Sequence, residues 1–221
     1  MTLAEPAVPL TDFGLAIECA LFVWLLSPRA GASSGQGRWF RVFFASTGLA
    51  AFLGGVVHGF LTDSSSRAHA ALWTATLIAS GVSALAIWMI GAELVDRPYA
   101  REIRRIALAA FTAYLAVIVV QNTFVIAIIA FLPAVLFLLI VFGWRYRRRR
   151  ETAALWGIAG LLLMLLGAAV QRAGSGRLPD WFNHNAVFHV IQALALACLF
   201  AAAGRFGQPA RRHPTSPVVA R

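Results

Sequence analysis

The chain has 221 residues, of which 60% are apolar and only 13% are charged, and its mean hydropathy is +0.75. Soluble domains carry about a quarter charged residues, so this composition excludes a soluble single-core protein and requires lipid as the solvent. The formal net charge is +10 and every basic residue is Arg, but these residues lie in short segments between apolar runs, which indicates membrane topology and not nucleic-acid binding.

Seven apolar windows follow one another along the chain, each suited to a helix that crosses a membrane. Between the fourth and fifth windows only Gln121 and Asn122 interrupt the hydrophobicity. One helix over both windows would be far too long for a bilayer of ~30 Å, so a tight helical hairpin is predicted. Cys19 and Cys198 lie inside apolar windows, which excludes a disulfide framework and favours packing roles. The predicted helices cover residues 11–26, 42–61, 69–94, 106–120, 123–142, 153–170 and 185–203.

The Arg residues divide unevenly between the two sides of the membrane that these helices define. Sixteen of the nineteen lie on one side, in the first, third and fifth connections and in the C-terminal segment. By the positive-inside rule this side is the cytoplasm, so the N-terminus is predicted to be outside and the C-terminus in the cytoplasm. The predicted fold is an all-α, polytopic bundle of seven transmembrane helices over residues 1–206, with a disordered basic cytoplasmic tail over residues 207–221. The expected location is a cell membrane of the bacterial inner-membrane type.

Polar side chains gather near the outer end of the predicted bundle, where ionisable groups are costly and are therefore functional candidates. His58 lies one turn before the second helix ends, and His69 begins the third helix on the same side. His184 and His189 open the seventh helix at that level. Residues three, four or seven apart share a helix face. This spacing predicts three polar stripes: Thr47, Ala51, Gly54 and His58; His69, Thr76, Ser80 and Ser83; and Asn185, His189 and Gln192.

Glu18 lies two turns inside the first helix, with no basic residue near it in the sequence. Its carboxylate requires a proton, a histidine or a metal ion within the bundle. Because the first and seventh helices adjoin when seven helices close into a ring, we expect Glu18 to face His58 or His189. In that arrangement helices one, two, three and seven enclose the polar cluster, whereas helices four, five and six present mostly apolar faces.

Imidazoles at one level on different helices are suitable zinc ligands, because a catalytic zinc site needs three nitrogen or oxygen donors and an open position for water. The predicted ligands are His58, His69 and His189, with His184 within reach through a bend at the helix start. Zinc-bound water ionises near neutral pH and attacks an ester or amide carbonyl. Glu18 and Gln192 would then orient the ligands or transfer protons. These residues indicate a zinc-dependent hydrolase of a membrane lipid.

The spacing resembles the superfamily of seven-helix hydrolases and receptors that contains the alkaline ceramidases and the progestin and adiponectin receptors. That superfamily has Ser-x3-His late in helix two, Asp eleven residues later and His-x3-His early in helix seven. The matching residues here are Gly54-x3-His58, then His69, then Asn185-x3-His189. The resemblance implies a zinc site and a lipid amide or ester substrate. Because Asn is a poor zinc ligand and the Ser is replaced, it also implies altered or lost hydrolysis.

Two other functions are compatible with the same residues. One is a non-enzymatic membrane sensor, or a structural or partner subunit, in which the polar cluster binds a small ligand. The other is a haem b protein with His58 and His189 as axial ligands from facing helices. The chain is also similar to uncharacterised bacterial seven-helix membrane proteins. Membrane lipid is the expected partner, and the sequence leaves the oligomeric state open.

The Arg distribution makes the orientation testable. Reporter fusions at Arg221 and between Asp63 and Ala68 should report opposite sides of the membrane, with the first fusion in the cytoplasm. A cytoplasmic signal from the second fusion would contradict the predicted orientation.

Overall fold

The computed structural model describes residues 6–27, 35–174 and 183–206, and within these ranges the chain is all-α. Each predicted window forms one helix, and all seven helices are long and apolar enough to cross a membrane. The chain is therefore a multi-pass membrane protein, as the sequence predicts. The predicted tail, residues 207–221, lies outside the described residues. The helices are α1 (Ala7–Leu25), α2 (Gly35–Phe60), α3 (Arg67–Leu94), α4 (Arg97–Val120), α5 (Phe124–Arg149), α6 (Thr152–Ala173) and α7 (His184–Phe206).

Three helices extend well beyond their apolar windows, and the first of them, α2, begins at Gly35 instead of residue 42. α4 begins at Arg97 instead of residue 106, with Pro98 in its first turn, and α5 continues to Arg149 instead of residue 142. Proline is favourable in the first turn of α4 because the N–H it lacks would have no partner there. The Arg residues at the end of α5 are accommodated because their long side chains reach headgroups or water. The hairpin at Gln121 and Asn122 is confirmed, because α4 ends directly before it and α5 begins directly after it.

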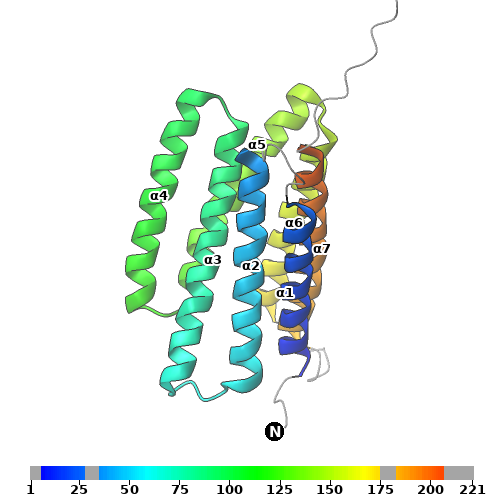
Figure 1. Ribbon diagram of the computed structural model, residues 1–221. Coiled ribbons are helices and arrows are strands. Elements are labelled where there is room, and N and C mark those ends of the chain that lie inside the picture. The colour runs from blue at the N-terminus through cyan, green and yellow to red at the C-terminus, as the bar shows by residue number, and fades with distance from the viewer. Residues whose placement is uncertain (1–5, 28–34, 175–182, 207–221) are drawn as a thin grey trace, which may run out of the picture.

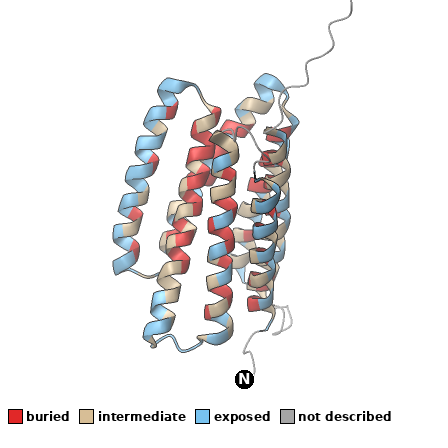
Figure 2. Cartoon of the chain, in the orientation of Figure 1, coloured by how far each residue is buried: buried red, intermediate tan, exposed pale blue. Residues whose placement is uncertain are grey.

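Six helices form a closed ring, and α4 lies outside it. The neighbours around the ring are α1–α2, α2–α3, α3–α5, α5–α6, α6–α7 and α7–α1, while α4 packs only against α3 and α5 (Figure 1). Tyr114 anchors α4, because its ring fills the space beside Gly81 of α3 and its hydroxyl donates to the Leu77 carbonyl oxygen at 2.6 Å. α3 is the most buried helix and α4 the least (Figure 2). The ring thus contains six helices, and the expected ring of seven is wrong.

An aromatic core fills the ring toward the end that carries Arg97, Arg145 and Arg205, here called the arginine end. Phe22 of α1 stacks on Phe200 of α7 with their ring centroids 4.3 Å apart. Aromatic pairs of this kind contribute roughly 0.5–1.5 kcal/mol beyond the burial of their area. This contact holds the first and last helices together at the arginine end.

Arg145 forms a clamp at the arginine end. Its guanidinium group donates two hydrogen bonds of 2.8 Å to the Glu151 carboxylate and a third of 3.1 Å to the Leu94 carbonyl oxygen. The same guanidinium lies 5.6 Å from the centre of the Phe206 ring. A bidentate Arg–carboxylate pair is among the stronger hydrogen-bonded contacts, so the clamp joins the ends of α3, α5 and α7 to the start of α6.

Glycine allows two pairs of neighbouring helices to approach closely. A Cβ atom added to Gly160 of α6 would lie 2.9 Å from the Ala195 carbonyl oxygen and 2.8 Å from Leu199 Cγ of α7. A Cβ atom added to Gly48 of α2 would lie 2.8 Å from Cys19 Cβ of α1. Small residues at helix crossings permit such close packing in membranes.

We expect Gly160→Ala to lower the thermal unfolding midpoint of the purified protein, because overpacking against a backbone oxygen costs about 1–3 kcal/mol. Gly204→Ala is the matched control: nothing lies within 4 Å of its added Cβ, and Ala is the better helix former. Its midpoint should be unchanged or slightly higher. Equal midpoints for the two variants would contradict the close packing of α6 on α7.

Candidate functional site

A cavity of about 370 Å³ lies inside the ring, and all six ring helices line it. The three polar stripes of the sequence analysis meet there, with the exception of His69. α5 and α6 line the cavity as well, so the enclosing set is larger than the predicted four helices, although their lining residues are apolar apart from Gln171. The polar wall consists of Asp12 of α1, Thr47, Gly54 and His58 of α2, Thr76, Ser80 and Ser83 of α3, and Asn185, His189 and Gln192 of α7.

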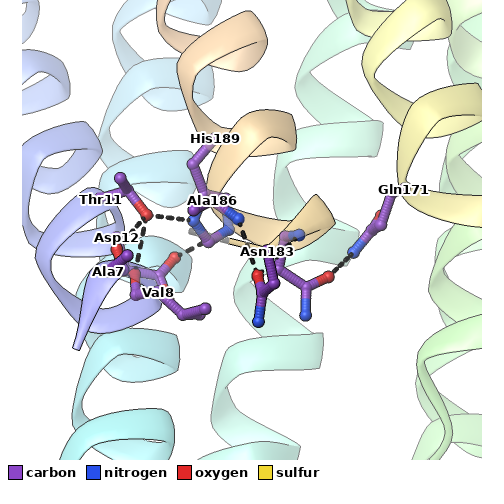
Figure 3. Close-up of polar contacts among 9 residues, drawn as sticks. Ala7, Val8, Thr11, Asp12, Gln171, Asn183, Ala186 and His189 are labelled. Carbon is purple, nitrogen blue, oxygen red and sulfur yellow. Dashed lines mark hydrogen bonds and ion pairs between the residues drawn. The ribbon is translucent and has the colours of Figure 1, made fainter. Parts of the chain in front are cut away.

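The polar centre of this wall is a contact between α1 and α7. Asp12 Oδ1 lies 3.3 Å from His189 Nε2, and Thr11 Oγ1 lies 2.8 Å from His189 Nδ1 (Figure 3). The side chains of Asp12 and His189 expose only 7% and 11% of their surface. Thr11 Oγ1 also lies 2.8 Å from the Ala7 carbonyl oxygen and 2.9 Å from that of Val8. Both ring nitrogens of His189 therefore have a partner on α1.

The hydrogen-bond partners of Thr11 determine where the protons lie. A hydroxyl group has one proton, and the carbonyl oxygens below Thr11 accept it, so Thr11 Oγ1 accepts from the Nδ1–H of His189. One proton then lies between His189 Nε2 and Asp12 Oδ1, because two lone pairs would repel each other. The pair is a carboxyl group with a neutral imidazole or a carboxylate with an imidazolium, and either form has no net charge, as a low-dielectric site requires.

The second carboxyl oxygen of Asp12 is buried and has no hydrogen-bond partner in the described part of the chain. It faces Gly54 of α2, where an added Cβ atom would lie 3.6 Å from Oδ2. This is an ordinary van der Waals distance, so the position of Gly54 could hold a small group against this oxygen. A buried acceptor without a partner costs about 1–3 kcal/mol, so Oδ2 is a position at which a bound group would be stabilised.

His69 closes the connection between α2 and α3 and does not line the cavity. Its Nδ1–H donates to the Leu61 carbonyl oxygen at 2.6 Å, and its backbone N–H donates to Ser66 Oγ at the start of α3. In the same connection the hydroxyl and backbone N–H of Ser65 donate to Asp63 and hold the pKa of that carboxyl group below its usual range. His69 therefore holds the end of a helix hairpin.

The predicted zinc ligands do not come together. His58 and His189 line the cavity, but His69 is bound to its own connection and His184, the first residue of α7, is not part of the wall. Within residues 6–27, 35–174 and 183–206, no group of three or more His, Cys, Asp or Glu side chains is placed to hold a metal ion. These donors do not fit a three-ligand zinc site, and the partners of His189 do not fit an axial haem ligand. Zinc and haem binding remain predictions.

The two residues with predicted catalytic roles differ in position. Gln192 lines the cavity on the face of α7 that carries His189. Glu18 is not among the lining residues, and no hydrogen-bond partner for its Oε2 atom lies in the part of the chain that the structure describes. Asp12 has the contact with His189 that was expected of Glu18.

The sequence analysis missed Asp12, although a signal for it exists. Asp12, Leu15, Cys19 and Phe22 are three or four residues apart and form the buried face of α1. An acidic residue on the apolar face of a membrane helix points into the bundle. Helical spacing places Asp12 on one face with Leu15, Cys19 and Phe22, which makes it a candidate beside Glu18.

We expect Asp12→Ala and His189→Ala each to lower the free energy of unfolding by about 3–5 kcal/mol, because either change leaves a buried polar group without its partner. The double variant should lose less than the sum of the two, which a double-mutant cycle measures. Glu18→Gln, a change in a side chain with no partner for Oε2, should leave the unfolding midpoint unchanged. Strictly additive losses in the double variant would show that Asp12 and His189 do not interact.

Comparison with known proteins assigns the chain to a family without assigning a function. The match to this family spans residues 7–208, which include all seven helices described above. No curated protein and no solved structure matches the chain. The resemblance to the ceramidase and receptor superfamily thus stays a prediction. The chain belongs to DUF6962, a family of unknown function.

Proposed function

We propose that this membrane protein binds a small amphipathic molecule in the cavity of its six-helix ring, and that it serves as a sensor or partner subunit and not as an enzyme. The observation that carries the proposal is the cavity itself, whose volume of about 370 Å³ lies in the range of small-molecule sites, roughly 300–1,000 Å³. Such sites are mostly apolar and contain a few polar groups that orient the ligand.

The two walls of the cavity match the two parts of an amphipathic molecule. α5 and α6 contribute apolar side chains such as Phe131 and Met164, whereas the opposite wall contains the Asp12–His189 pair. Leu132 of α5 lines the cavity and also exposes 43% of its surface. The cavity therefore reaches the apolar outer surface of the ring, which supports access for a ligand from the lipid phase.

Ligand binding is better supported than the zinc-dependent hydrolysis predicted from the sequence. His189 already has partners at both ring nitrogens, and His69 lies off the cavity wall. Stoichiometric zinc in the purified protein that is lost in His189→Ala would favour the hydrolase instead.

Two adjacent alanines of α6 provide a test. Ala168 lines the cavity, whereas Ala169 is exposed on the outside of the ring. We expect Ala168→Phe to fill part of the cavity and to remove small molecules that native mass spectrometry detects on the purified wild-type protein. Ala169→Phe should retain them. The proposal would be contradicted if both variants carried the same bound molecules as the wild type.

A further inference from the structure

We propose that the ligand of this cavity has a polar end that is an uncharged or cationic hydrogen-bond donor, of the primary amine or alcohol class, and not a carboxylate or a phosphate. This inference rests on the proposed function and names the ligand class for the same cavity. Its basis is the hydrogen-bonding capacity that the cavity wall leaves unmet, since polar groups in a pocket bind the groups that complement them.

The strongest unmet acceptor is Asp12 Oδ2. The Asp12 side chain exposes only 7% of its surface, and its other oxygen faces His189 at 3.3 Å. Oδ2 has no hydrogen-bond partner among the described residues. Asp12 and Gly54 both line the cavity, and a Cβ atom added to Gly54 would lie 3.6 Å from Oδ2, at an ordinary van der Waals distance. A donor group that enters the cavity beside Gly54 and reaches Oδ2 would supply the hydrogen bond that this oxygen lacks.

Hydroxyl groups on α2 and α3 add further acceptors to the same wall. Thr76 Oγ1 donates to the Leu72 carbonyl oxygen at 2.9 Å, and Ser80 Oγ donates to the Thr76 carbonyl oxygen at 3.0 Å. Thr47 Oγ1 and Ser83 Oγ lie 3.0 Å apart and share a hydrogen bond. Each hydroxyl group has a single proton. Because Thr76 and Ser80 direct theirs to the backbone, they can offer a ligand only lone pairs.

The charges on the wall select against an anion. The residues that line the cavity within the described ranges include no Arg. A carboxylate bound beside Gly54 would also lie next to the Asp12 carboxyl group, and two such groups disfavour each other's ionised form. Gln171 Nε2 already donates to Asn185 Oδ1 at 3.3 Å. The wall thus offers a phosphate or carboxylate no guanidinium group and places the Asp12 carboxyl group beside it, whereas an amine or a hydroxyl group finds several acceptors.

Tryptophan quenching in phosphatidylcholine nanodiscs tests this inference. The probes are terminally brominated decylamine, decanol and decanoate, because bromine quenches tryptophan fluorescence on contact. Trp73 lines the cavity, so the quenching that Trp73→Phe removes reports binding in the cavity. At neutral pH we expect saturable quenching by the amine and the alcohol, with the carboxylate weaker by at least about tenfold, as one hydrogen bond to a charged or buried partner implies.

Variants at the polar wall test whether Asp12 is the group that favours the amine over the carboxylate. Asp12→Asn should weaken binding of the amine by about tenfold or more, whereas Glu18→Gln, the same chemical change on the same helix but off the cavity wall, should not. Gly54→Ala is a second variant that the fold accommodates, since its Cβ atom makes only ordinary contacts. It fills the space beside Oδ2 and should weaken the amine as Asp12→Asn does.

The outcomes separate this inference from the proposed function. Tighter binding of the amine than of the alcohol supports a cationic ligand, and equal binding supports an uncharged donor. Binding of decanoate as tight as that of decylamine, unaffected by Asp12→Asn and Gly54→Ala, would overturn the inference and leave ligand binding intact. If none of the three probes quenches Trp73 saturably, the proposed function itself is overturned.

Discussion

The contact between Asp12 and His189 joins the first helix of the chain to the last, and the arrangement of the ring depends on it. Two ionisable groups are costly in an apolar interior unless they neutralise each other. α1 and α7 therefore have to meet on these faces, with Asp12 and His189 at one end of the bundle and the Phe22–Phe200 stack at the other. The remaining ring helices connect α1 to α7 around a common interior.

The cavity exists because many of the residues that face the interior of the ring are small. Ala51 and Gly54 of α2 face Ala127 of α5 and Gly167 and Ala168 of α6 across the interior. Such small side chains cannot fill the space between six helices, although larger aromatic residues fill it at the arginine end. Among the described residues, the unfilled volume lies beside a wall on which Asp12 Oδ2 has no hydrogen-bond partner. We assign a ligand to the cavity because an unfilled volume and a hydrogen-bond acceptor without a partner lie side by side.

Much of the fold could be predicted because it depends on local properties of the sequence. Apolar windows gave the seven helices, and helical spacing brought Thr76, His189 and Gln192 to the interior. The position of α4 outside the ring could not be predicted, since it depends on how Tyr114 docks against Gly81 of α3. His69 shares a helix face with Thr76, but it lies in the first turn of α3, where the Leu61 carbonyl oxygen binds its ring.

The carboxyl group of the site was the least predictable part. Glu18 and Asp12 both lie in the first apolar window, and the choice between them depends on which face of α1 meets α7. The length, hydropathy and charge of this window do not specify how α1 is rotated about its own axis. The structure shows the rotation directly: Asp12, Leu15 and Cys19 lie on the buried face of α1, and only one face of a membrane helix packs against its neighbours while the other faces lipid.

Solid-state NMR with isotope-labelled aspartate and histidine tests the central contact most directly. Dipolar recoupling between the Asp carboxyl carbons and the His ring nitrogens, in protein reconstituted into lipid bilayers, measures whether Asp12 and His189 meet in the membrane. The structure predicts a coupling that corresponds to the 3.3 Å contact of Oδ1 with Nε2 and that disappears in Asp12→Asn. A spectrum identical for the wild type and Asp12→Asn would show that the two helices do not join at this pair and would contradict the ring.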